Sequence, residues 1–154
     1  MTSIVFTNAV HVLAAVIWVG GMFFAHMVLR PSAGAFEPPE RLQLWGRVFS
    51  RFFPWVWAAV VALLATGYWQ VIVVFGGFAN AGLHVHLMHA IGLLMIALYS
   101  YLYAVPYRRF RNAVETADWP AAGGRLNVIR RIVVTNLTLG LITIALGASG
   151  RYWI

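Results

Sequence analysis

Five histidines are the residues whose type and position could do chemistry in this chain. They are His11, His26, His84, His86 and His89. Each lies in or beside a long apolar block, where an ionisable group is costly and is therefore a functional candidate. Cysteine is absent, which excludes disulfide scaffolds, thiolate metal sites, iron–sulfur clusters and thiol catalysis. Histidine and methionine remain as the soft metal ligands.

Two of these histidines are expected at the same depth in a membrane. His11 lies about 10 Å from the start of the first apolar block, and His89 lies about 9 Å from the start of the third, at about 1.5 Å per helical residue. Imidazoles from two helices at one level can hold a haem iron from both sides. The pattern predicts one b-type haem near the outer face, with His11 and either His89 or His86 as iron ligands. His26 has no histidine opposite it and is expected to be structural.

The segment from His84 to His89 also favours a second metal. His84, His86, Met88 and His89 present imidazole and thioether donors, which suit copper. A copper ion entering there would move past Met22, Met27 and His26. The same segment could instead hydrogen-bond water and lipid headgroups at the interface.

Four apolar blocks must position these side chains. Hydrophobic residues make up 62% of the 154 residues and charged residues only 10%, against about 25% charged in a typical soluble domain. The blocks span about 4–29, 52–78, 83–107 and 132–154, each long enough to cross about 30 Å of hydrocarbon. They predict an all-α integral membrane four-helix bundle, with 1–154 as a single transmembrane domain. The first block lacks a basic leader and is expected to remain in the mature protein.

The arginines predict the orientation of the bundle. All of them except Arg151 lie in the links at 30–51 and 108–131, which carry proline and glycine and are expected to separate the helices. Short arginine-rich links stay in the cytoplasm, so both termini are expected to be periplasmic. The chain is then a multi-pass protein of the bacterial inner membrane. Its formal charge of +7 reflects this orientation and contact with membrane lipid, and nucleic acid is not expected as a partner.

Several further residues could support a cofactor. Trp18 lies on the His11 face of its helix, with Gly20 and Gly21 beside it, where small residues permit close approach of a ring or of another helix. Arg151 could pair with a haem propionate, or could only extend to the interface. In the second block, either Thr66 or Gln70 could accept a hydrogen bond from a ligand imidazole. Asn136, Gly140, Thr143 and Gly147 form a small, polar stripe on the last helix that is expected to pack against other helices.

The segment from His11 through Trp18 to Gly20 and Gly21 resembles the first transmembrane motif of the copper resistance D (CopD) family and of the related HemJ-type proteins. Met88-His89-Ala90 and Asn136 are similar to positions in later HemJ helices. The HemJ resemblance implies b-type haem bound through His11, with Trp18 and Gly20 as its supporting motif, and a protoporphyrinogen oxidase activity. The CopD resemblance implies copper handling. Ile91 and Leu137 replace the lysine and glutamate of the HemJ pattern, which favours haem binding without that oxidation.

The leading interpretation is a membrane cytochrome that carries electrons between a quinol and an acceptor at the periplasmic face. It would be a haem-dependent oxidoreductase if the haem also took part in catalysis. The alternatives are a copper transport or resistance protein, a noncatalytic membrane scaffold, and a HemJ-type protoporphyrinogen oxidase. A second copy of the chain is a further candidate partner.

Overall fold

Four long helices form an antiparallel bundle. The computed structural model describes residues 2–153, except for the side chain of Arg151. The helices that could span a membrane are Thr2–Ala35, Pro38–Val73, Leu83–Glu115 and Trp119–Ser149. Within the described residues there is no strand. The predicted all-α, four-span architecture is confirmed.

Two of the four spans are built from several segments. The first contains α1 (Thr2–Ala15), α2 (Gly21–Phe24) and α3 (Arg30–Ser32), joined through π-helical turns at Val16–Gly20 and Ala25–Leu29 and closed by a 3₁₀ turn at Ala33–Ala35. The third contains α5 (Leu83–Leu102) and α6 (Arg108–Glu115), joined through a π-helical turn at Tyr103–Tyr107. Pro106 lies in that turn, whose wider hydrogen-bond spacing tolerates the missing N–H of proline. The second and fourth spans are the single helices α4 (Pro38–Val73) and α7 (Trp119–Ser149).

The helices extend further than their apolar blocks. The prediction that residues 30–51 and 108–131 are links between helices is wrong for most of these residues, which are helical. The chain between the helices there is confined to residues 36–37 and 116–118. Pro38 and Pro120 stand in the first turn of α4 and α7, where a missing backbone N–H costs nothing. The helical part of the last block ends with a short 3₁₀ turn at Gly150–Tyr152, and Ile154 lies outside the described residues.

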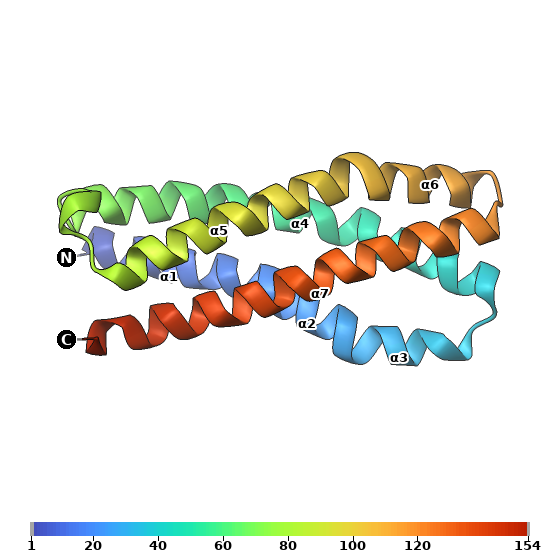
Figure 1. The fold of residues 1–154 in the computed structure, drawn as a ribbon, viewed down its shortest axis with the longest axis horizontal. Coiled ribbons are helices and arrows are strands. Elements are labelled where there is room, and N and C mark those ends of the chain that lie inside the picture. The colour runs from blue at the N-terminus through green and yellow to red at the C-terminus, as the bar shows by residue number, and fades with distance from the viewer. Residues whose placement is uncertain (1, 154) are drawn as a thin grey trace.

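The two ends of the bundle differ in charge. Figure 1 shows both termini at one end, together with the connection between α4 and α5; α3 and α6 lie at the other end. We call the first the termini end (residues 2–15, 66–90 and 143–153) and the second the arginine end (residues 30–51 and 108–131). At the termini end the connection turns through Gly76 and Gly77, whose positive φ angles of 69° and 113° favour glycine.

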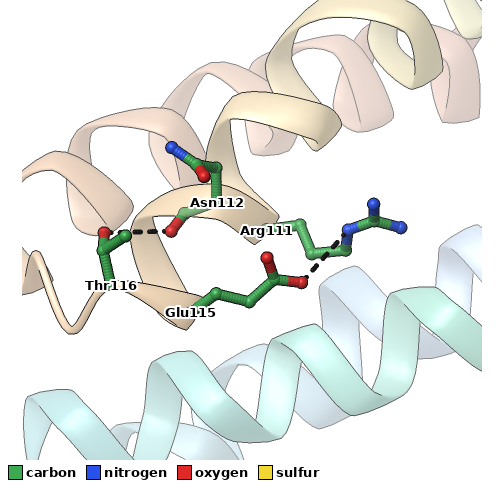
Figure 2. Close-up of polar contacts among 4 residues, drawn as sticks. All are labelled: Arg111, Asn112, Glu115 and Thr116. Carbon is green, nitrogen blue, oxygen red and sulfur yellow. Dashed lines mark hydrogen bonds and ion pairs between the residues drawn. The ribbon is translucent and has the colours of Figure 1, made fainter.

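At the arginine end, α6 closes with local contacts (Figure 2). The Thr116 hydroxyl donates to the backbone oxygen of Asn112 at 3.0 Å, and Arg111 Nε lies 3.4 Å from Glu115 Oε1. Both charged side chains are mostly exposed, so this ion pair contributes little to stability.

An aromatic core fills the half of the bundle nearer the arginine end. We call this half the arginine half and the other the termini half. Phe49 and Phe53 of α4 stack with 5.1 Å between ring centroids, and Tyr107 contacts both rings edge-on. Phe110 is fully buried against the same group. In pairwise terms, α1 packs mainly on α4, and α5 and α6 pack mainly on α7. The two helix pairs are therefore joined most firmly at the arginine half.

Candidate functional site

His11 is held by α4. Its Nδ1 lies 2.8 Å from the Thr66 hydroxyl oxygen, which lies 2.6 Å from the backbone oxygen of Ala62. A hydroxyl has one proton, and the shorter contact to Ala62 takes it, so Thr66 accepts from the Nδ1–H of His11. The other ring nitrogen, Nε2, then carries the lone pair that a metal ligand needs. Thr66 is one of the two residues predicted to accept a hydrogen bond from a ligand imidazole, and the structure pairs it with His11.

His89 is held by a different part of α4. Its Nε2 lies 3.0 Å from the Tyr68 hydroxyl, and its ring lies 4.9 Å from that of Phe78 between centroids. Thr66 and Tyr68 are two residues apart, so they project about 200° apart around α4. The two histidines therefore contact different faces of the same helix. Ligation of one iron by both His11 and His89 stays a prediction. It requires the Nε2 of His89 to leave its hydrogen bond with Tyr68 and bind the metal instead.

The other residues predicted for a haem site lie apart from one another. His86 is exposed, with its ring 5.8 Å from that of Phe78. Trp18 is buried and meets Tyr99 edge-on at 6.0 Å between centroids. Gly20 is exposed with open space beside it, whereas a side chain at Gly21 would collide with the ring of Phe52. The side chain of Arg151 lies outside the described residues, so its predicted contact with a propionate stays a prediction.

A row of soft donors runs along one face of α5 toward α7. We call it the donor row; its members are His84, Met88 and Met95. Each lies against a glycine of the fourth span or of the turn that follows it: the Met95 methyl against Gly140 and the Met88 thioether against Gly147 of α7, and the His84 ring against Gly150 of the 3₁₀ turn after α7. A Cβ at Gly147 would lie 3.0 Å from the Met88 methyl and 3.4 Å from its sulfur, and one at Gly140 would lie 3.2 Å from the Met95 methyl. The absence of side chains on α7 thus makes room for these donors inside the bundle.

Sequence reasoning identified His84 and Met88 as donors but missed Met95. A single methionine in an apolar span is usually a flexible core side chain, and nothing within α5 marks this one as different. The signal was available in the pairing of two helices. Gly140 and Gly147 are seven residues apart on α7, as Met88 and Met95 are on α5, and antiparallel helices bring such positions into register.

The donor row leads to a small cavity at the centre of the bundle. The Asn136 amide nitrogen donates to the backbone oxygen of Met95 at 3.1 Å. Asn136 and Met22 both line the cavity, and both are almost fully buried. Within residues 2–153, Asn136 Oδ1 has no hydrogen-bond partner. Met27, predicted to be on a copper route, is 56% exposed and points away from this interior.

The chemistry of these donors suits a monovalent soft cation. In the described part of the chain, no group of three or more His, Cys, Asp or Glu side chains could hold a metal ion. A site in the bundle therefore depends on thioethers beside imidazole, and thioether ligands select Cu(I). The carboxylates all lie at the arginine end, so the donor row adds no negative charge that would favour a divalent ion.

Comparison with known proteins agrees with this donor chemistry. A family model described as copper resistance protein D matches residues 46–149, about two thirds of the chain. The matched part includes the whole donor row and Asn136, while His11, Trp18 and Met22 precede it. No curated protein and no solved structure matches the chain. With most of its length covered by that one model, this multi-pass membrane protein belongs to the copper resistance protein D (CopD) family.

Proposed function

We propose that this protein binds Cu(I) within the membrane and passes it along the donor row. The observation that carries the proposal is the alignment of His84, Met88 and Met95 against three glycines, two in α7 and one in the 3₁₀ turn that follows it. Family membership supports the choice of metal. Copper is the cargo of this route, and it enters and leaves as Cu(I) without a change of oxidation state.

The arginine distribution supports a direction for this movement. All arginines except Arg151 lie at the arginine end, which we assign to the cytoplasmic side of a bacterial inner membrane. His84 then lies near the periplasmic face, where copper would bind first, with exposed His86 beside the entrance.

The spacing of the donors supports stepwise transfer. Along α5, Met88 lies about 6 Å beyond His84, and Met95 lies about 10 Å beyond Met88, at 1.5 Å per residue. Asn136 Oδ1 and the Met22 thioether line the next cavity. Several weak sites in series let an ion enter readily and still leave, as conduction requires.

Anaerobic titration of the purified full chain with Cu(I), against a chelator of known affinity, tests the proposal. The wild type should take up stoichiometric copper. Met88→Leu and Met95→Leu should weaken binding on the order of tenfold or more, since even supporting groups of metal sites contribute that much. Met27→Leu is the matched control, because Met27 is exposed and lies off the row. Equal copper binding by all four proteins would overturn the proposal.

A second candidate function rests on His11. Its Nδ1–H is held by Thr66, which leaves Nε2 available to a haem iron. In this candidate His11 and either His89 or His86 ligate one b-type haem, Trp18 and Gly20 support it, and Arg151 pairs with a propionate. The haem would supply one-electron chemistry between a quinol and a periplasmic electron carrier.

A visible spectrum separates the two candidates. A haem protein should show a Soret band and a sharp reduced α-band that His11→Ala abolishes, whereas the copper protein should show neither. If neither copper nor haem is bound, the remaining function is a noncatalytic scaffold, and a membrane partner should then copurify.

A further inference from the structure

An open cavity near the arginine end lies beyond the donor row and shares Met22 with the copper route proposed above. It lies between the first, second and fourth spans, and the space between these walls is about 530 Å³ when the open space at its mouth is counted. Side chains that define it include His26, Arg30, Trp45, Phe52, Arg130 and Val133. None of its lining residues carries a carboxylate. Its polar groups are therefore mainly hydrogen-bond donors.

Two of these donors are buried without a partner. Trp45 is only 3% exposed, and within residues 2–153 neither its Nε1 nor Arg130 Nε has a hydrogen-bond partner. The Arg130 guanidinium lies over the Trp45 ring, 5.8 Å from its centroid, so the two side chains are neighbours in the wall of the cavity. Leaving a buried donor unpaired costs about 1–3 kcal/mol, and a bound acceptor would remove that cost.

The positive charge around the cavity favours binding of an anion. Arg30 and Arg130 both line the cavity, so two guanidinium groups stand in its wall. The ion pair seen among residues 2–153 lies elsewhere, between Arg111 and Glu115. A bound anion would offset the repulsion between the Arg30 and Arg130 guanidinium groups and accept from the unpaired N–H groups of Trp45 and Arg130.

The remaining wall of the cavity is apolar. Val48, Phe49, Phe52 and Val133 line it below the arginines. The four spans are about 50 Å long, some 20 Å longer than the hydrocarbon core, and Trp45 lies about 10 Å from the start of α4. These lengths put the arginines near the level of lipid headgroups and the apolar wall near the level of acyl chains.

We infer that this cavity binds the headgroup of one anionic phospholipid. The phosphate accepts hydrogen bonds from Trp45 Nε1 and Arg130 Nε, Arg30 adds charge at the mouth, and the first part of an acyl chain lies along Phe52 and Val133. The bound lipid would join the first, second and fourth spans at the cytoplasmic side. This inference does not depend on the copper proposal, because Trp45 and Arg130 are not members of the donor row.

Native mass spectrometry of the full chain in detergent tests the inference. Dioleoylphosphatidylglycerol should form one tight adduct, and dioleoylphosphatidylcholine should bind at least fivefold more weakly. Trp45→Phe keeps the ring beneath Arg130 but removes the N–H, and should weaken the phosphatidylglycerol adduct about fivefold. Arg130→Gln should weaken it by a similar factor or more, and Arg130→Lys by less. Arg131→Gln is the matched control, because Arg131 is exposed and does not line the cavity.

Two further arms identify the source of the anion. Millimolar inorganic phosphate should not displace phosphatidylglycerol, since it lacks the chain that the apolar wall contacts, and oleate should bind more weakly. Displacement by phosphate or tighter binding of oleate would overturn the assignment to a phospholipid. An equal loss with Arg131→Gln, or equal binding of the two phospholipids, would overturn the site itself. Circular dichroism and elution volume confirm that each variant is folded.

Discussion

The arginine half and the termini half of this bundle use opposite ways of filling the space between helices. In the arginine half, large rings meet large rings: Phe53 alone contacts five other aromatic side chains at 4.7–6.5 Å between centroids. In the termini half, flexible side chains of α5 meet glycines of α7, and His11 and His89 each hydrogen-bond to one hydroxyl group of α4.

This difference assigns the stability of the bundle to the arginine half and its proposed function to the termini half. Interlocking rings allow few arrangements, so the arginine half holds the helices together. Methionine has three rotatable side-chain bonds, and the glycines opposite it leave space in which the thioether can move. A route for an ion needs donors that can rearrange, which the termini half supplies. The predictions below test this division, beginning with the largest expected effect.

Removing a ring from the aromatic core should be the most damaging change. Phe53→Ala should lower the free energy of unfolding by about 3–5 kcal/mol, because Phe53 is buried at the centre of the core and would leave a cavity. Phe78→Ala, in the termini half, should cost less than half as much, since Phe78 is partly exposed and its ring neighbours Tyr68, His86 and His89 lie outside the buried core. Unfolding in mixed detergent measures both, and similar losses would contradict the division.

Adding a methyl group at a glycine of α7 that faces the donor row should have the next largest effect. A Cβ at Gly140 would lie 2.7 Å from Val19 Cγ2 and 3.2 Å from the Met95 methyl, so Gly140→Ala forces both neighbours to shift. We expect a loss of about 1–3 kcal/mol, the usual range for overpacking, together with weaker copper binding. Gly92→Ala on α5 is the matched control, because open space surrounds that glycine. Unchanged stability and copper affinity for Gly140→Ala would show that neither packing nor copper binding needs the space beside Gly140.

The sequence was sufficient for the fold class but not for the site. Apolar length determines how many helices cross a membrane, so the number of spans was predictable from composition. Their ends were not, because an arginine-rich segment with proline in its first turn can continue a helix beyond the membrane, as at Pro38 and Pro120. His11 and Thr66 could be paired from depth and chemistry. His89 with Tyr68, and Met95 with Gly140, depend on the rotation of each helix about its axis, which periodicity within one helix does not determine.

Thr66→Val should have a smaller effect on stability and a specific one on His11. Valine preserves the shape of threonine but cannot accept from Nδ1–H, so we expect a loss of about 1 kcal/mol. The proton should then redistribute between the two ring nitrogens, which ¹⁵N chemical shifts of the imidazole report directly. Thr143→Val is the control, since the Thr143 hydroxyl bonds only to the backbone oxygen of Leu139 in its own helix. An unchanged His11 tautomer would show that Thr66 does not select it.

Glu115→Gln should have the smallest effect of all, although it breaks the ion pair shown in Figure 2. Both partners are nearly two thirds exposed, and an i, i+4 pair of this kind contributes about 0.3–0.5 kcal/mol at low salt. Added salt should remove even that difference, because it screens exposed charges. A loss above about 1 kcal/mol at low salt that added salt removes would mean that surface charge helps to stabilise the arginine half. The aromatic core would then not be sufficient to explain why this half is the more stable one.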